Sequence, residues 1–299
     1  MLARVAGAVL IVNPYSTRVT DERAERVERV LRGYVDLRVE YTRYPGHATE
    51  LAAAATTTAD AILVFSGDGT YNEALNGASG AVPFGFLPGG GTSVMPRALG
   101  YPRDPVEAAK RLGENLAAGR SRRISVGAVN GRRFWFSAGL GLDGEAVRRL
   151  NVLRDANGGA RPGDLAFVRE FAVMAWERRG RWDAVLEVEG VGRAAFVLVS
   201  NTDPYTYAGP FGLHLTPAAR FELGLDFVAA PRLRLSNIAT LLVQSFRGRP
   251  GRGFLRGHDL DRIEVRCDRP LPLQADGEDL GDVEVAVFET QRGSVAVVA

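Results

Sequence analysis

Two glycine-rich stretches have the residue types that hold a phosphate group. The first, SGDG at 66–69, follows an apolar run at 61–65 and is followed by Thr70 and then an Asn-Glu pair. Its two glycines can adopt backbone conformations that are disfavoured for other residues, so that backbone N–H groups can approach an anion. Asp68 between them can reach a magnesium ion, and Thr70 can donate to a phosphate oxygen. The stretch therefore predicts a phosphate-binding turn that leads into a helix.

The second stretch, PGGGTS at 88–93, follows the next apolar run at 82–87. Consecutive glycines do not favour a helix, since each costs about 1 kcal/mol relative to alanine there. They do permit a close approach between the backbone and a ligand. Two such loops on neighbouring strand ends are more specific than either alone, and together they predict a site for a polyphosphate.

A third group lies far downstream, where Asp276 and Glu278 flank Gly277. Taken by themselves, these residues favour a plain hairpin turn between strands at 271–274 and 283–288. Such a turn presents both carboxylates locally. One carboxylate that accepts a hydroxyl proton, next to a metal that bridges phosphate oxygens, is what phosphoryl transfer requires.

The composition excludes several classes of protein. Lys110 is the single lysine and lies in a helical stretch, which removes both a Walker A loop and a protein-kinase core. Cys267 is alone, so there is no disulfide framework and no cysteine-based zinc cluster. The net charge of +2 gives no signal for a nucleic-acid partner. The three histidines are scattered and form no HExxH motif.

Strand-like and helix-like patterns alternate over the first 120 or so residues, as they do around a mostly parallel sheet. We expect strands at 8–12, 37–41, 61–65 and 82–87. We expect helices at 21–31, at 49–55 and from Asn72 onward. A further helix should follow Asp104, with Asp104 as its N-cap and Pro105 in its first turn. Ligands collect beyond the carboxyl ends of such strands. Those ends carry Asn13, Thr42, 66–72 and 88–93.

From about residue 122 the pattern changes to short alternating runs separated by turn residues, which predicts antiparallel β structure. Two helices interrupt it, at 165–179 and at 236–247. The sequence thus predicts an α/β domain at 1–121 followed by a β-rich domain from 122 to about 287.

Five motifs, in order along the chain, resemble the diacylglycerol kinase catalytic-domain family, which includes bacterial soluble lipid kinases and sphingosine kinases. They are VNPYS at 12–16, SGDGTYNEALNG at 66–77, LPGGGTSVMPRALG at 87–100, SAGLGLDGEAV at 137–147 and QADGEDLG at 274–281. Segments 201–207 and 267–278 look like the actinobacterial branch of that family.

The resemblance implies a lipid kinase that uses ATP and Mg²⁺ and converts diacylglycerol to phosphatidic acid. Its active site would lie in a cleft between a Rossmann-like α/β domain, to which residues 288–299 return, and a β-sandwich domain. Asp276 would be the general base, and Asp68 and Glu278 would hold the metal. The residues carried over as nucleotide contacts are Asn13, Thr42, Ser66, Gly67, Asp68, Gly69, Thr70, Asn72, Glu73, Gly89, Gly90, Gly91, Thr92 and Ser93.

The chain also departs from the family pattern. Gly91 stands where the second loop commonly has threonine, and Ser93 stands where it has asparagine. At 220–226, RFELGLD lacks the Asp-Asp-Gly-like segment of a structural magnesium site, so we do not predict that site. Three alternatives stay open: a kinase for a sphingoid base or another lipid alcohol, an NAD kinase, and a nucleotide- or lipid-binding protein whose kinase site has decayed.

The expected partner is a lipid at a membrane surface. Aromatic residues alternate with arginines at 167–182, and 245–257 is arginine-rich, as in segments that contact anionic headgroups. No apolar run reaches the roughly 18 residues of a membrane span. We interpret 1–14 as a buried strand, and we expect a cytoplasmic protein with peripheral membrane contact. A homodimer is left open.

Overall fold

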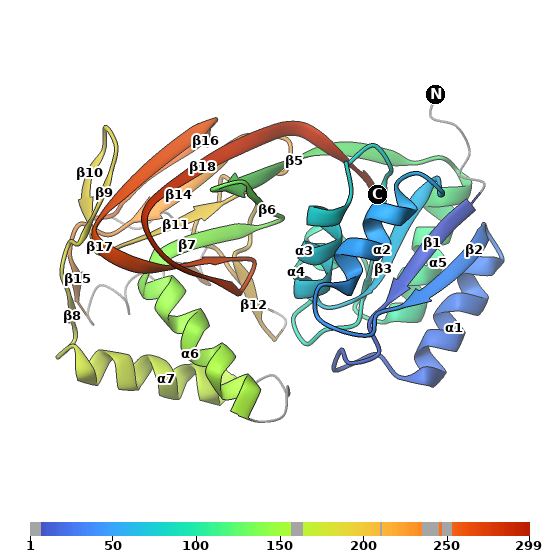
Figure 1. The fold of residues 1–299 in the computed structure, drawn as a ribbon, viewed down its shortest axis with the longest axis horizontal. Helices are drawn as coiled ribbons and strands as arrows, with labels where there is room; N and C mark the ends of the chain where they lie inside the picture. Colours follow the sequence, from blue (N-terminus) through green and yellow to red (C-terminus); the bar gives the residue numbers. More distant parts are fainter. Residues whose placement is uncertain (1–6, 157–163, 210, 235–244, 247–252) are drawn as a thin grey trace. The chain divides into compact units, whose positions relative to one another are not determined.

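The computed structural model describes residues 7–156, 164–209, 211–234, 245–246 and 253–299 (Figure 1). The chain divides into two compact units. The first comprises Met1–Val126 and Arg292–Ala299, and the second comprises Gly127–Gln291. Two long strands, β5 (Ser121–Val129) and β18 (Glu278–Val298), contribute residues to both. Each unit is described by itself below.

The first unit contains a parallel sheet in the order β2-β1-β3-β4. Its strands are β1 (Gly7–Val12), β2 (Asp36–Tyr41), β3 (Ala61–Ser66) and β4 (Phe84–Pro88). The C-terminal end of β18 extends the sheet, with Val297 opposite Phe84. Every residue of β3 and β4 is buried, which explains why both read as continuous apolar runs rather than alternating ones.

Helices cover both faces of this sheet (Figure 1). They are α1 (Asp21–Arg32), α2 (His47–Ala55), α3 (Asp68–Gly77), α4 (Val94–Ala98) and α5 (Pro105–Ala117). Contacts pair α1 with α5 and α2 with α3. The predicted start of α5 is confirmed: the Asp104 carboxylate accepts hydrogen bonds from the N–H groups of Val106 and Glu107, each at 2.9 Å, and Pro105 is in the first turn.

One expected boundary is wrong. The pattern predicts a helix from Asn72, but α3 begins at Asp68, so Asp68 and Gly69 lie in the first turn of the helix rather than in a loop before it. Gly67, its N-cap, has an extended backbone, and neither Gly67 nor Gly69 has a positive φ. The short helix α4 in the second stretch was not predicted.

The second unit is rich in antiparallel strands, as expected. Its main sheet runs β16-β14-β11-β7-β17-β18. The strands there are β7 (Ser137–Gly141), β11 (Phe196–Ser200), β14 (Leu225–Ala229), β16 (Leu255–Leu260) and β17 (Arg262–Ala275), together with the first part of β18. Shorter strands are β6 (Arg132–Phe134), β8 (Arg181–Trp182), β9 (Leu186–Val188), β10 (Gly192–Ala194), β12 (Thr206–Ala208), β13 (Phe211–Leu213) and β15 (Leu233–Arg234).

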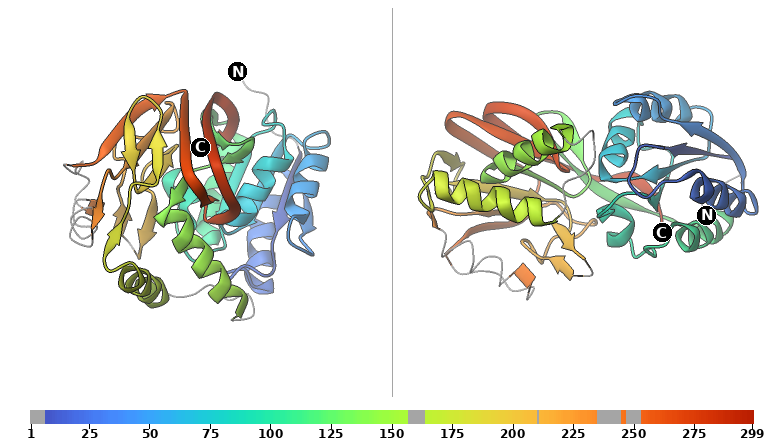
Figure 2. Two further views of the ribbon diagram at one scale, coloured as in Figure 1. Left: turned by 60° about the vertical axis from the view of Figure 1, so that its left-hand side comes forward. Right: turned by 90° about the horizontal axis from the view of Figure 1, so that it is seen from below.

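Two helices pack against this strand-rich unit, α6 (Leu142–Ala156) and α7 (Asp164–Glu177) (Figure 2). Met174 of α7 lies in a buried cluster with Phe196 of β11 and Val228 of β14, and Leu142 of α6 packs against that cluster. Helix α7 agrees with the prediction at 165–179, whereas α6 was not predicted. The expected helix at 236–247 lies almost entirely outside the described residues.

Within the part of the chain that the structure describes, no helix has the length and apolar character needed to cross a membrane.

Candidate active-site residues

The first glycine-rich stretch is joined to the second through Asp68. Its carboxylate oxygen Oδ1 accepts hydrogen bonds from the backbone N–H of Val94 at 2.7 Å and of Met95 at 3.3 Å. These N–H groups belong to the first turn of α4, where intrahelical partners are lacking. Asp68 therefore fixes the position of α4, which directly follows the second stretch. This role was not predicted from the sequence.

The glycines bring the two stretches into backbone contact. A Cβ atom on Gly90 would lie 2.7 Å from the Cα of Gly67, and one on Gly89 would lie 2.6 Å from a methyl group of Val19. Only glycine permits this packing. Gly91 differs, because it is exposed and a Cβ atom there would meet nothing within 4 Å. Of the three consecutive glycines, Gly91 is thus the one whose surroundings leave room for a ligand.

Hydroxyl and amide groups meet at the carboxyl ends of β1 and β3. Ser16 Oγ lies 2.8 Å from Ser66 Oγ, which donates to Thr70 Oγ1 at 2.7 Å. Asn13 Nδ2 also donates to Thr70 Oγ1, at 3.0 Å. Thr42 is buried after β2, and its N–H donates to the Val12 carbonyl at 2.9 Å. The topology thus brings Asn13, Ser66 and Thr70 together, as expected from the strand order.

Three further α3 residues support the scaffold. The Tyr71 hydroxyl lies 2.7 Å from the carbonyl oxygens of Ser66 and Leu87, at the ends of β3 and β4, and burial raises its pKa well above the ordinary value. Asn72 is fully buried and accepts a hydrogen bond from Asn76. Glu73 accepts one from the N–H of Ala48 in the first turn of α2. For Asn72 and Glu73, nucleotide contact stays a prediction.

The second loop ends at Ser93, whose φ of 49° lies in the left-handed region. Its hydroxyl is 3.2 Å from both the N–H and the carbonyl of Gly90, which closes the turn. Ser93 is buried, while Thr92 is half-buried. Nucleotide contact by either residue stays a prediction.

In the second unit, Asp276 occupies the turn between β17 and β18, with a φ of 50°. Its carboxylate accepts backbone hydrogen bonds from Trp135 at 2.7 Å, Phe136 at 3.0 Å and Ser137 at 3.2 Å, and the side chain is buried. Three N–H donors stabilise the ionised carboxylate. Asp276 is thus a rigidly held carboxylate in a hairpin turn.

Glu278, two residues on, forms an ion pair with Arg132 of β6 at 3.1 Å. The two carboxylates that flank Gly277 therefore have different environments: one is held by backbone N–H groups and the other by a guanidinium. No group of three or more His, Cys, Asp or Glu side chains is arranged to hold a metal ion among the described residues. The metal-binding roles of Asp68 and Glu278 stay predictions.

A buried network that sequence reasoning missed supports the Asp276 turn. Asp143 of α6 accepts hydrogen bonds from the Tyr205 hydroxyl at 2.7 Å and from Gln274 Nε2 at 2.5 Å. Gln274 in turn accepts the N–H of Gly277 at 2.9 Å. Burial raises the pKa of Asp143, and the two donors act against that rise. The sequence offered only the acidic position in GLDGEAV as a signal.

The region that departs from the family pattern contains Asp226 on β14. Its Oδ1 accepts hydrogen bonds from His258 Nδ1 at 2.8 Å and from the N–H of Asp259 at 3.0 Å. Gly224 donates to Asp259 at 2.7 Å. These bonds tie β14 to β16.

Comparisons with known proteins agree with these observations. Residues 7–129 match the model of the diacylglycerol kinase catalytic domain. Over these residues, the chain is similar to the diacylglycerol kinase catalytic-domain family. A Bacillus subtilis diacylglycerol kinase is 33% identical over 140 residues, which is 45% of each chain. The resemblance that the motifs indicated is confirmed over this segment.

The fold prediction is also confirmed. A crystal structure of a diacylglycerol kinase from Bacillus anthracis is similar at a TM-score of 0.72 and 18% identity, over 99% of this chain and 97% of that one. An NAD kinase from Archaeoglobus fulgidus in complex with ATP is similar at a TM-score of 0.52 and 16% identity, over 98% and 93% of the two chains. At these identities the likeness is one of fold. The chain spans about half the length of the curated relatives it matches.

Proposed function

We propose that this protein is an ATP-dependent lipid kinase that transfers the γ-phosphate to the hydroxyl of diacylglycerol. The observation that carries the proposal is the closure of the two glycine-rich stretches on each other through Asp68 and Val94, inside the segment that matches the kinase family. Such closure fixes backbone N–H groups before a phosphate arrives, and pre-organised donors are what phosphoryl transfer needs.

In this proposal the first unit binds the nucleotide. The exposed Gly91 and the side chains of Asn13 and Thr70 fit a phosphate, because they offer backbone N–H, amide and hydroxyl donors. Bound Mg²⁺ supplies neutralisation of the phosphate charge. Asp68 and Glu278, whose carboxylate oxygens suit this hard cation, are the residues proposed to hold it.

The acceptor hydroxyl reacts with the help of Asp276. A bond forms between the acceptor oxygen and the γ-phosphorus, the bond from that phosphorus to the leaving ADP oxygen breaks, and the hydroxyl proton passes to the Asp276 carboxylate. The three N–H donors hold that carboxylate in one orientation, which positions it for a general base. The network from Asp143 through Gln274 holds the turn.

Diacylglycerol is the proposed acceptor because the matched family model and the Bacillus subtilis relative carry that name. The nucleotide loops themselves do not select the acceptor. A sphingoid base or another lipid alcohol is therefore the second candidate. NAD is the third, supported only by the shared fold of the NAD kinase.

The protein must meet its lipid at a membrane surface, and we propose α7 for that contact. Trp176 on α7 is 87% exposed and Val173 is 38% exposed, which is unusual for large apolar side chains. Arg178 and Arg179 follow at the end of the helix. Exposed apolar side chains next to arginines are typical of helices that lie at an anionic membrane surface.

The test is transfer of a labelled γ-phosphate from ATP with Mg²⁺ across a panel of diacylglycerol, sphingosine, ceramide and NAD. Strong labelling of diacylglycerol supports the proposal. Labelling of another lipid keeps the kinase and changes the acceptor, whereas labelling of NAD alone overturns the lipid kinase. No labelling while ATP still binds supports a decayed kinase site.

A further inference from the structure

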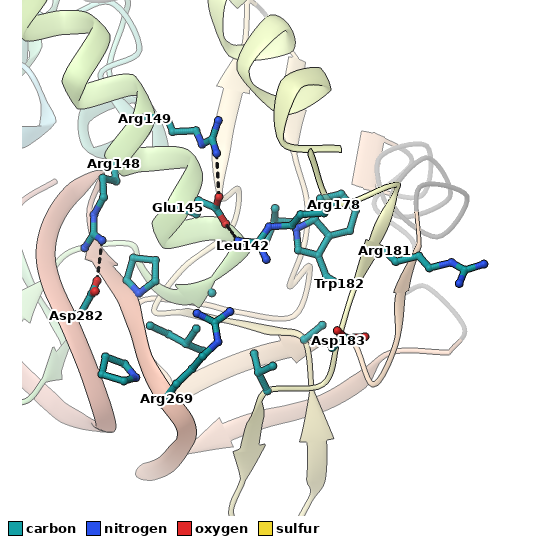
Figure 3. A pocket seen from close by; sticks show the side chains of 16 residues that line it. Leu142, Glu145, Arg148, Arg149, Arg178, Arg181, Trp182, Asp183, Arg269 and Asp282 are labelled. Atoms are coloured by element: carbon teal, nitrogen blue, oxygen red, sulfur yellow. Dashed lines mark hydrogen bonds and ion pairs between the residues drawn. The ribbon is translucent and has the colours of Figure 1, made fainter. Parts of the chain in front are cut away.

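The second unit contains a cavity of about 380 Å³ that the proposed phosphotransfer does not use. It is bordered by α6, by the residues that follow α7, by β8 and by β17 (Figure 3). Five arginines and three acidic side chains line it together with apolar residues. The charged residues are Glu145, Arg148, Arg149, Arg178, Arg181, Asp183, Arg269 and Asp282.

Three of these arginines are fixed by carboxylates. Arg148 binds Asp279 through two hydrogen bonds of 2.7 and 3.0 Å, and it lies 2.7 Å from Asp282. Glu145 accepts from Arg149 at 3.2 Å and from Arg178 at 2.7 Å. These ion pairs orient the three guanidinium groups and largely neutralise them.

The other two arginines, Arg181 and Arg269, make no side-chain hydrogen bond or ion pair with any described residue. They differ in direction. In Figure 3 the Arg269 side chain points into the cavity, while that of Arg181 points away from it. Arg269 lies on β17 immediately before Pro270, whose fixed φ limits the local backbone. Among the lining arginines, Arg269 is therefore the one that points into the cavity and is paired with no carboxylate of the described residues.

The lining also contains apolar surface. Trp182 and Leu271 are both buried, at 6% and 4% exposure. The fork of N–H donors on arginine matches the oxygens of a phosphate group. The volume beyond Arg269 accommodates carbon atoms attached to that phosphate.

We propose that this cavity binds a phosphate monoester or diester, with Arg269 as its charge partner and Trp182 and Leu271 against its carbon skeleton. The ligand is either the headgroup of an anionic lipid or a soluble phosphate ester. Both share the chemistry that the cavity recognises. The site does not depend on the proposed kinase activity, since binding there requires no ATP and no turnover.

The experiment follows Trp fluorescence of the whole protein without nucleotide, titrated in separate arms with glycerol 3-phosphate, with vesicles of phosphatidylcholine alone, and with vesicles that also contain phosphatidic acid. Three proteins are compared: the wild type, Arg269→Gln and Arg181→Gln. Both substitutions remove one positive charge from an exposed side chain on the cavity lining, so they are matched in charge and differ in direction. Thermal unfolding of each variant checks that the fold is intact.

Arg269→Gln is expected to weaken binding about tenfold, the loss of one charge-assisted pair, while Arg181→Gln changes it by less than about twofold. If this difference between the variants is seen with glycerol 3-phosphate, the ligand is a soluble ester. If it is seen only with the vesicles that contain phosphatidic acid, the ligand is a lipid headgroup. The proposal is overturned if the wild type binds neither ligand, or if the two substitutions weaken binding equally, since that would be a general effect of charge.

Discussion

The carboxylate of Asp68 accepts a 2.7 Å hydrogen bond from the backbone N–H of Val94, which joins the first turn of α3 to the first turn of α4. The two glycine-rich stretches of the sequence are therefore one structural feature. Gly67 and Gly90 are in backbone contact, and the Asp68 carboxylate accepts a hydrogen bond from Val94 beside that contact.

The first prediction separates the charge of Asp68 from its hydrogen bonds. Asp68→Asn keeps an oxygen that can accept from Val94 but removes the negative charge, so Mg²⁺-dependent affinity for ATP should fall about tenfold or more. Stability should change by less than about 1 kcal/mol, within the range of a helix N-cap substitution. Calorimetric titration of ATP with and without Mg²⁺ measures the first effect, and thermal unfolding measures the second.

Asp60→Asn is the matched control, because Asp60 precedes β3 and lies at the opposite end of that strand. It should leave ATP affinity unchanged. Equal Mg²⁺-dependent affinity in the wild type and Asp68→Asn would remove Asp68 from the metal site.

The second prediction concerns the glycines. Gly90→Ala places a methyl group 2.7 Å from the Cα of Gly67, which forces the two stretches apart and should destabilise the fold by about 1–3 kcal/mol. Gly91→Ala adds the same methyl group where nothing lies within 4 Å, and it should change stability by less than about 0.5 kcal/mol. Urea unfolding of both variants checks this. Equal effects at the two positions would contradict the proposed backbone contact.

The third prediction is a pH dependence set by Asp143. Burial raises its pKa above the ordinary value of 3.8, so the unfolded chain loses this proton at a lower pH than the folded protein does. Asp143 therefore lowers stability progressively as pH rises from about 4 through the raised folded pKa. Asp143→Asn should remove this dependence, and the Tyr205 hydroxyl can accept from the new amide. The melting temperatures of both proteins, compared at several pH values, measure it.

Asp279→Asn is the opposite case in the same unit. The hydrogen bonds from Arg148 lower the pKa of Asp279, so its contribution to stability is present at neutral pH and is lost as pH falls through that lowered pKa. As pH rises, Asp143→Asn should therefore gain stability relative to the wild type, whereas Asp279→Asn should lose stability relative to it. The same direction for both would show that the burial of Asp143 does not set the dependence.

The fourth prediction concerns membrane contact through α7. Trp176→Ala should reduce binding to vesicles that contain anionic lipid several-fold, because this ring is 87% exposed and would be buried in the interface. The stability of the Trp176→Ala variant should equal that of the wild type. Tyr15→Ala removes another ring, 77% exposed, from the first unit and serves as the control in a vesicle sedimentation assay. If both variants sediment like the wild type, α7 is not the contact.

Local signals explain most of what the sequence predicted correctly. The Asp104 cap with Pro105, the buried runs of β3 and β4, and the hairpin turn at Asp276 each depend on a few neighbouring residues. Periodicity and turn chemistry carry that information directly. The family motifs added the expectation that residues 288–299 return to the first domain.

What the sequence did not predict depends on residues far apart in the chain. Helix α6 was not predicted, and Gly144 near its start serves a packing contact, because a Cβ atom there would lie 2.1 Å from the carbonyl oxygen of Pro272. The Asp68–Val94 bond spans 26 residues, and the Gln274–Asp143 bond spans 131. No pattern of neighbouring residues reports such pairs.

The most direct test of the account compares the wild type with Asp276→Asn in the transfer of labelled γ-phosphate from ATP to diacylglycerol in vesicles. We predict labelled phosphatidic acid from the wild type, and a loss of about 10²- to 10⁴-fold in the variant at unchanged ATP affinity, the range expected when a general base is removed. Equal turnover would contradict the role of Asp276. Absence of labelled lipid from the wild type, with ATP bound, would contradict the proposed diacylglycerol kinase itself.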